Sequence, residues 1–281
     1  MAIVVQHINA TADDIQGNHG IGRYFFITGS DGRARQISEL FSHRTEKYHP
    51  RQHNLYMGQL KAPDGSMVDV AAISSGMGGP SADIIINELA MLGAKRLLRV
   101  GTSGTLHPEA VKGGDLVVAT GAVRDDKASW DYIYPEFPAM ASFEYIQASK
   151  LAAQKNLFSD RKIHFGIVHS KSSLFAREYQ FSLLKDSMDY MDAIRNAGVI
   201  ASEMECAQFF TLGPILTARY HDMFNPQETI RCGAILSIIG DESGFMKDPE
   251  KIKRANECSI AFAIASTMEM YLLDKKERGI V

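Results

Sequence analysis

Short apolar runs that end at glycine alternate with helical patterns along the whole 281-residue chain. The run RYFFIT, from Arg23 to Thr28, is typical of a buried strand, and Gly29 follows it directly. The run from Lys95 to Val100 continues in the same way into Gly101. Strands that alternate with helices favour an α/β layered fold, which we expect to be built around a mixed sheet. Because ligands bind at the carboxyl ends of strands in such folds, we expect the chemistry at these glycine-marked ends.

The middle of the chain carries the clearest local signals. The segments 54–60 and 67–74 predict a hairpin, with its turn at 62–65. Pro80 suits the first turn of a helix, and the apolar residues from Ala82 to Ala90 follow the spacing of a helix packed on a sheet. Further strands are expected at 115–120, 162–168 and 232–239, and further helices at 33–42, 142–156, 178–196, 203–220 and 248–273.

Charge and cysteine content exclude several classes of protein. The net charge is -3, without the basic surplus that nucleic-acid-binding proteins usually carry. The three cysteines are far apart and form no C-x-x-C clip, which favours a reducing compartment and no bound metal. No apolar run is long enough for a membrane span, and the first residues do not resemble a signal peptide. We therefore expect one cytoplasmic domain over residues 1–281.

Glycine and arginine stand together after the first strand, in the sequence from Gly29 to Arg33. Glycine allows a ligand to come close to the backbone, and the free N–H groups at a helix start attract anions. Arg33 is placed to add two hydrogen bonds to a phosphate. The alternative is a tight turn followed by a solvated arginine.

Arg99 lies inside a predicted buried strand, where an unpaired charge is costly. Its partner is either an internal carboxylate or a bound anion. The next residues, 101–104, contain two glycines and two hydroxyls, which we interpret as an anion-binding nest.

Acidic residues supply the remaining candidates. Glu203 and Glu205 are expected in the first turn of a helix, where they either stabilise the helix dipole or bind the hydroxyls of a diol. Asp241 follows the strand at 232–239, as either a proton donor or a helix cap. The loop 75–81 has the wrong spacing for a dinucleotide fingerprint and suits a small ligand or a simple turn equally well.

Three longer stretches resemble the nucleoside phosphorylase family of uridine phosphorylases and hexameric purine nucleoside phosphorylases. They are SSGMGGPSADIIINELAMLGAKRLLRVGTSGT at 74–105, PEFPAMASFE at 135–144 and EMEC at 203–206. The resemblance, which is greatest to uridine phosphorylases, implies a single-domain three-layer α/β/α fold with a central mixed sheet. It implies a pentosyltransferase that cleaves a nucleoside with phosphate, giving the base and ribose 1-phosphate. Inorganic phosphate is then a co-substrate, and no cofactor is expected.

The resemblance also implies the site residues. Catalytic roles fall on Arg99, Glu205 and Asp241. Phosphate contacts fall on Gly29, Arg33, Arg51, Arg99 and Thr102, and ribose contacts on His7, Glu203, Met204 and Glu205. Base contacts fall on Ser103, Gly104, Phe175, Glu178, Gln180 and Asp241. Arg51 and His7 are expected from a neighbouring subunit, which implies a homo-oligomer of at least two chains.

Two departures from the family pattern leave the base open. Uridine phosphorylases usually carry a Gln-x-Arg pair, which the stretch 170–181 lacks in register. At the end of the last strand, this chain has Asp241 where they have asparagine. Uridine is the leading substrate, and a purine nucleoside with Asp241 as general acid is the alternative. A water-using nucleosidase and a non-catalytic nucleoside-binding protein are further alternatives. The segment 213–229 is interpreted as an insertion.

Overall fold

The computed structural model describes residues 4–155, 158, 161–241 and 244–280. Within this part of the chain, eleven strands form one mixed sheet. They are β1 (Tyr24–Thr28), β2 (Ser42–Lys47), β3 (Leu55–Lys61), β4 (Met67–Ser74), β5 (Arg96–Thr105), β6 (Leu116–Asp125), β7 (Ala139–Met140), β8 (Ile163–Lys171), β9 (Ala201–Glu203), β10 (Arg231–Asp241) and β11 (Gly244–Phe245). The helices are α1 (Ala12–Ile15), η1 (Asn18–Gly20), α2 (Asp31–Ser38), α3 (Gly79–Met91), α4 (Lys127–Trp130), α5 (Phe143–Ala153), α6 (Leu174–Glu178), α7 (Ser187–Asn196), α8 (Cys206–Tyr220) and α9 (Pro249–Arg278).

Four parallel strands form the middle of the sheet, in the order β4, β1, β5, β10. On one side, the antiparallel strands β3 and β2 extend it. On the other side, β5, β9, β8, β6 and β10 pair in a closed ring, because β10 contacts both β5 and β6. This ring brings the ends of β5, β8 and β9 close together.

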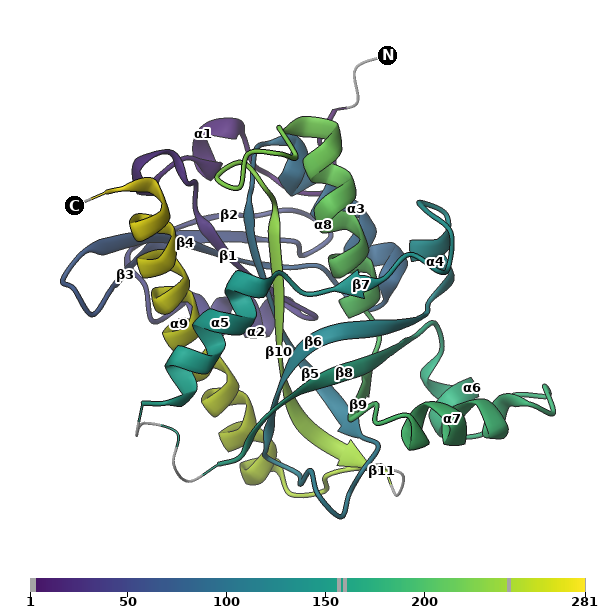
Figure 1. The fold of residues 1–281 in the computed structure, drawn as a ribbon. Coiled ribbons are helices and arrows are strands. Elements are labelled where there is room, and N and C mark those ends of the chain that lie inside the picture. Colours follow the sequence, from purple (N-terminus) through teal and green to yellow (C-terminus); the bar gives the residue numbers. More distant parts are fainter. Residues whose placement is uncertain (1–3, 156–157, 159–160, 242–243, 281) are drawn as a thin grey trace.

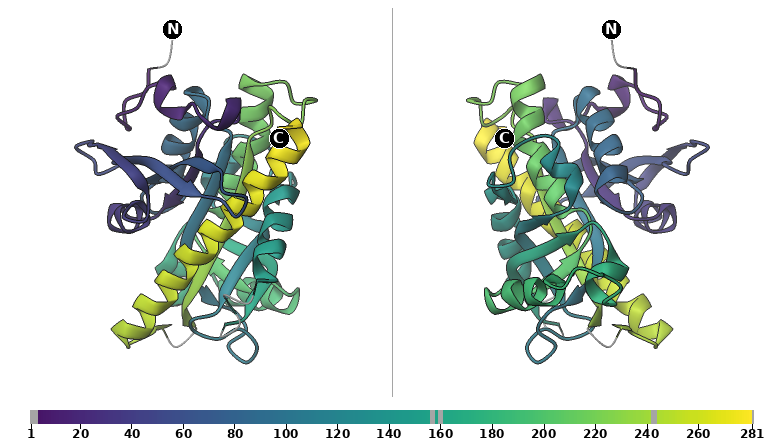
Figure 2. Two further views of the ribbon diagram at one scale, coloured as in Figure 1. Left: turned by 90° about the vertical axis from the view of Figure 1, so that its left-hand side faces the viewer. Right: turned by 90° about the vertical axis from the view of Figure 1, so that its right-hand side faces the viewer.

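Helices cover both faces of the sheet, as the sequence predicts (Figure 1). One apolar core lies under α3 and α8, with Ile85 and Phe209 among its members. The other lies under α2, α5 and α9, with Ile37 and Phe262 among its members. The long helix α9 runs diagonally across its face in both side views (Figure 2). None of the helices in the described ranges has both the length and the apolar character of a membrane span.

Several sequence predictions are confirmed. The hairpin is formed by β3 and β4, which pair in antiparallel register from Tyr56 with Ala72 to Lys61 with Met67. Pro80 occupies the first turn of α3. The strands predicted at 115–120, 162–168 and 232–239 correspond to β6, β8 and β10, of which β6 continues to Asp125 and β8 to Lys171. The helix predicted at 142–156 corresponds to α5; residue 156 lies outside the described residues.

Other boundaries were predicted wrongly. The helix expected at 33–42 ends at Ser38, and an edge strand, β2, begins at Ser42. The helix expected at 178–196 is shorter, because α6 ends at Glu178 and α7 begins only at Ser187. By contrast, the helix predicted at 203–220 is confirmed as α8, which ends at Tyr220, and the interpretation of 213–229 as an insertion stays a prediction.

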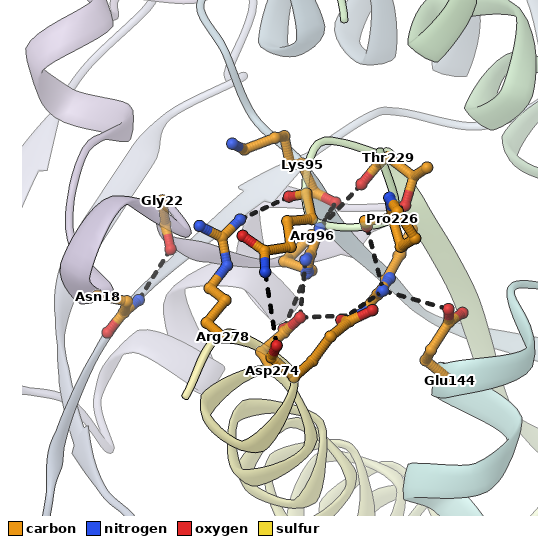
Figure 3. Close-up of polar contacts among 12 residues, drawn as sticks. Asn18, Gly22, Lys95, Arg96, Glu144, Pro226, Thr229, Asp274 and Arg278 are labelled. Atoms are coloured by element: carbon orange, nitrogen blue, oxygen red, sulfur yellow. Dashed lines mark hydrogen bonds and ion pairs between the residues drawn. The ribbon is translucent and has the colours of Figure 1, made fainter. Parts of the chain in front are cut away.

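A buried ionic cluster joins α9 to the amino ends of three strands. We call Tyr24, Arg96, Arg231 and Asp274 the Asp274 cluster. Arg96 donates two hydrogen bonds to Asp274, at 2.8 and 2.7 Å, as Figure 3 shows. Arg231 and Tyr24 donate to the same carboxylate, at 2.8 and 2.6 Å. Because its three strand residues are the first of β1, β5 and β10, the cluster lies at the edge of the sheet opposite the strands' carboxyl ends.

Candidate active site

A cavity of about 300 Å³ lies at the carboxyl ends of β1, β5 and β10. Residues after β1 and at the end of β8 line it, together with residues of β9, α2 and α6. Figure 1 shows this edge of the sheet, where the ends of β5, β9 and β10 meet beside α6. The cavity is therefore at the place that strand-end glycines predict for an α/β fold.

Arg33 supplies a positive charge at one end of the cavity. Gly29 and Ser30 line the cavity beside it, and Ser30 is the N-cap of α2. One Nη of Arg33 donates to Oδ1 of Asn256 at 3.2 Å. Among the described residues, no carboxylate forms an ion pair with this guanidinium. Burial and the neighbouring charge of Arg99 lower the pKa of Arg33 to about 10. Two like charges brought together in this way favour binding of an anion.

Arg99 has the first of its two predicted partners, an internal carboxylate, and the bound anion stays a prediction. It lines the cavity, and it also forms ion pairs with Glu203, at 3.3 Å, and with Glu205. Burial disfavours the charged guanidinium, but these two carboxylates outweigh burial and raise the pKa of Arg99. Its buried Nη1 has no hydrogen-bond partner among the described residues. Arg99 therefore keeps one donor available to a ligand.

Glu203 is held as a carboxylate by several donors. It accepts hydrogen bonds from the backbone N–H groups of Glu205 and Cys206 and from the hydroxyl of Ser170. Burial opposes its ionisation, but the charge of Arg99 and these hydrogen bonds lower its pKa. Glu203 is thus a fixed negative charge beside Arg99.

Glu205 bridges the loop after β4 and the start of α8. Its Oε1 accepts a hydrogen bond from the backbone N–H of Gly78 at 2.6 Å. Gly78 has a φ of 84°, a conformation that favours glycine, so the loop can present its N–H here. Burial and the nearby charge of Glu203 raise the pKa of Glu205, against the opposing charge of Arg99.

Of the residues predicted to contact phosphate or ribose, all but two line the first cavity of a single chain. Gly29, Arg33, Arg99, Thr102, Glu203, Met204 and Glu205 all line the cavity. Arg51 and His7 do not. Arg51 is exposed in the connection between β2 and β3, and His7 forms an ion pair with Glu88 at 2.8 Å.

The predicted base contacts divide between two cavities. Ser103, Gly104 and Glu178 line the first cavity, and the buried hydroxyl of Ser103 has no partner among the described residues. Gly104 and Glu178 also line a second cavity of about 160 Å³, together with Gln180 and Asp241. Phe175 lines neither and is exposed, in contact with Tyr179 and Phe181.

Two local predictions at the site are wrong. Residues 101–104 do not form a nest, because they continue β5 as extended backbone. Gly101 instead leaves room for Arg99, since a Cβ there would lie 3.0 Å from Nη2 of that arginine. Glu203 and Glu205 are not in the first turn of a helix: Glu203 ends β9, and Glu205 is the N-cap of α8.

Lys171 is a site residue that the sequence analysis missed. It ends β8, lines the first cavity and forms an ion pair with Glu178 at 2.5 Å. Its Nζ also donates to Oγ of Ser202 at 2.9 Å. Met77 and Ser202 line the cavity as well. A single lysine at the end of a strand carries no sequence signal, because only the pairing of β8 with β9 brings Ser202 beside it.

No group of three or more His, Cys, Asp or Glu side chains in the described ranges is arranged to hold a metal ion. The charged groups of the cavity are instead Arg99 and Lys171, each paired with carboxylates, and Arg33, which no described carboxylate pairs with. Such an arrangement can bind an anion at the end next to Arg33 and hydroxyl groups at Glu205.

Comparisons with known proteins agree with this geometry. A model of the phosphorylase superfamily matches residues 23–223. The uridine phosphorylase of Treponema pallidum is 32% identical over 84% of this chain and 82% of its own length. The uridine phosphorylase of Escherichia coli is 31% identical over 74% of this chain and 79% of its own. The guanosine phosphorylase of Halorubrum lacusprofundi is 29% identical over 82% of this chain and 86% of its own length.

Proposed function

The chain belongs to the phosphorylase superfamily, and on that premise we propose that it is a nucleoside phosphorylase with uridine as its preferred substrate. The enzyme is a pentosyltransferase: it transfers the ribose of a nucleoside to inorganic phosphate. A phosphate oxygen forms a bond to C1′ of the sugar while the bond from C1′ to the base nitrogen breaks. The products are ribose 1-phosphate and the free base, and the reaction is reversible.

One observation carries the proposal. Arg33, whose positive charge has no carboxylate partner in the described ranges, lies in the same cavity as Arg99, Glu203 and Glu205. The first two side chains suit a phosphate dianion. The carboxylates suit the hydroxyls of a pentose. A site for both substrates of phosphorolysis is therefore built into one cavity.

The charges of the cavity explain how the reaction is promoted. Phosphate binds between Arg33 and the free Nη1 of Arg99, below the sugar. Glu205 accepts hydrogen bonds from the ribose hydroxyls and fixes the ring, so that the phosphate oxygen lies in line with C1′. Positive charge that develops on the sugar is stabilised by Glu203 and Glu205. The leaving base accumulates negative charge, which hydrogen bonds from the other end of the cavity stabilise.

Two predicted contacts come from a second copy of the chain. We propose that Arg51 completes the phosphate site of a neighbouring subunit and that His7 contacts the 5′ end of its ribose. The exposed position of Arg51 in the connection between β2 and β3 leaves it accessible to a partner. The active form is then a homo-oligomer with at least two subunits, located in the cytoplasm, that uses no cofactor.

A purine nucleoside is the second candidate substrate. The second cavity shares the lining residues Gly104 and Glu178 with the first. It is also lined by Asp241, an acid that suits protonation of a purine ring nitrogen. The relative from Halorubrum lacusprofundi is named a guanosine phosphorylase. We therefore propose the nucleosides of 6-oxopurines, such as guanosine and inosine, as the second candidate substrates after uridine.

The deciding experiment measures release of the free base from uridine, guanosine and inosine, with and without inorganic phosphate. We expect phosphate-dependent cleavage, fastest with uridine. Inosine or guanosine cleavage without uridine cleavage would select the purine alternative. An equal rate in phosphate-free buffer would indicate a nucleosidase that uses water. Binding of nucleosides without cleavage would indicate a non-catalytic protein.

A further inference from the structure

Lys171 and Glu178 form an ion pair in the wall of the first cavity, and the side chain of Glu178 is 23% exposed. Their Nζ and Oε1 atoms lie 2.5 Å apart, and the side chain of Lys171 is only 2% exposed. Lys171 comes from the end of β8, whereas Glu178 comes from the end of α6. A buried lysine is costly to the fold unless its charge is compensated. A pair that is kept at this cost and that borders a cavity suits recognition of a ligand.

A chain of hydrogen bonds fixes Lys171 as a donor. Asp125 accepts two hydrogen bonds from Arg177, at 2.7 and 2.9 Å, and is the partner of His169 Nε2 at 3.0 Å. Because Asp125 only accepts, Nε2 of His169 carries the proton and Nδ1 accepts from the hydroxyl of Ser202, also at 3.0 Å. The oxygen of Ser202 can then only accept from Lys171.

The pair keeps hydrogen-bonding capacity for a ligand. Lys171 has three N–H donors. One donates to Ser202, and Nζ lies 2.5 Å from Oε1 of Glu178 in an ion pair that does not have the geometry of a hydrogen bond. Another donor reaches only the carbonyl oxygen of Glu203, at the long distance of 3.5 Å. Oε1 of Glu178 is buried and has no hydrogen-bond partner among the described residues, and Oε2 lies 3.7 Å from where a Cβ on Gly104 would stand. Lys171 therefore has one weakly used donor next to an unpaired acceptor of Glu178, and both residues line the cavity.

We infer that Lys171 and Glu178 together read the O=C–N–H edge of the nucleobase, an inference that rests on the proposed function. Lys171 donates to the carbonyl oxygen, and Glu178 accepts from the adjacent ring N–H. Uracil carries this edge at N3–H, and the 6-oxopurines carry it at N1–H. The same pair of residues thus accepts both classes of base.

The pair excludes bases that lack the ring proton. Cytosine presents a lone pair at N3, and adenine presents a lone pair at N1. Either one would place a lone pair against the Glu178 carboxylate and leave a buried charged group without a partner. Sites built around hydrogen bonds discriminate strongly against an analogue that lacks the matching group.

The first test compares kcat/KM for four nucleosides with the wild-type enzyme in phosphate buffer. We expect uridine and inosine to be cleaved, and cytidine and adenosine to be poorer by about 100-fold or more. Cleavage of cytidine at a rate close to that of uridine would overturn the inference. If no nucleoside is cleaved, the proposed function fails. Calorimetry of free uracil and free cytosine in phosphate buffer then tests the inference by itself, because only uracil is expected to bind.

The second test uses Glu178→Gln, because a glutamine can turn its amide N–H toward a ring lone pair. We expect kcat/KM for uridine to fall and the ratio of cytidine to uridine cleavage to rise by about 10-fold or more. Lys171→Met should lower uridine cleavage as well, with folding checked by thermal melting. Glu109→Gln, at a carboxylate that is 70% exposed on the surface, is the matched control and should leave the ratio unchanged. Equal losses on all nucleosides in Glu178→Gln would contradict the inference.

Discussion

Nε of Arg99 lies 3.3 Å from a carboxylate oxygen of Glu203, and both side chains are almost completely buried. Arg99 comes from the middle of β5, whereas Glu203 ends β9, more than 100 positions later in the chain. Each charge compensates the other in a place where an isolated charge would be very costly. The fold therefore holds Arg99, our proposed phosphate ligand, in position by internal ion pairs.

Replacing Arg99 should abolish most of the activity. Arg99→Ala removes a group that stabilises charge in the transition state, and we expect a loss of about 3 kcal/mol or more. The ratio of kcat/KM between wild type and variant, measured for phosphorolysis at low phosphate, gives this loss. The change also leaves Glu203 and Glu205 without their cation, so a lower melting temperature is expected. Arg99→Lys, which keeps the charge, should restore more of the stability than of the activity. An unchanged kcat/KM in Arg99→Ala would contradict the phosphate assignment.

Replacing Arg33 should act on phosphate binding more than on folding. Arg33→Gln removes a charge that no described carboxylate pairs with, so little stability is lost. The KM for phosphate should rise by about 10- to 100-fold, the value of one or two hydrogen bonds to a charged group. Arg35→Gln, on the same helix and largely exposed, is the control. If both variants show the same KM for phosphate, Arg33 is not part of the anion site.

Replacing Asp274 should destabilise the protein without touching the cavity. Asp274→Asn leaves Arg96 with an uncompensated buried charge, which costs about 3–5 kcal/mol, whereas Arg231 keeps its ion pairs with Glu144 and Glu277. Denaturant unfolding measures the loss. The exposed Glu39→Gln serves as a control. A loss below about 1 kcal/mol would show that the Asp274 cluster contributes little to stability.

The pH dependence of stability should follow the buried carboxylates. Burial opposes ionisation of Asp274, but hydrogen bonds from Arg96 and its charge outweigh it and lower the pKa below the ordinary 3.8. A carboxyl with a lowered pKa contributes stability above its ordinary pKa and loses it as the pH falls through the folded-state value. The free energy of unfolding should therefore fall as the pH drops below about 4. In Asp274→Asn the free energy of unfolding should fall less steeply over the same pH range. If wild type and variant show the same pH dependence, Asp274 is not its cause.

Asp241 should matter for purine cleavage more than for uridine cleavage. A purine leaves more easily when an acid protonates its ring, and Asp241 lines the second cavity, next to the cavity of the proposed ribose site. In Asp241→Asn, kcat for guanosine or inosine should fall at least about 10-fold further than kcat for uridine. Parallel measurements on the three nucleosides decide it. Equal losses on all of them would mean that Asp241 has a structural role.

The sequence predicted those helices and strands whose formation depends on residues that are neighbours in the chain. The hairpin of β3 and β4 was predicted because its turn residues lie next to one another in the sequence. The edge strand β2 was missed, since its sequence SHRTEK is polar and exposed and lacks apolar alternation. Its pairing with β3 is a tertiary contact. A buried arginine predicted a partner for Arg99, but only the fold shows that Glu203 and Glu205 provide it.

The base end of the site was the least predictable part. Glu178 was predicted, yet its partner Lys171 was not, because the burial of Lys171 depends on β9 and α6 packing against the end of β8. The predicted contacts Gln180 and Asp241 line a separate cavity that no sequence spacing indicates. Strand ends locate a site, whereas the side chains that complete it depend on contacts between distant segments.

Arg96 and Arg99 lie three positions apart on β5, so their side chains leave opposite faces of the sheet. One binds α9 through Asp274, and the other binds the residues that open α8. Inserting or deleting one residue between them would move one guanidinium to the wrong face, leaving two carboxylates in the interior unmatched. Chimeras and circular permutants of this enzyme can accept new loop lengths, but every exchange should keep this ten-residue segment whole.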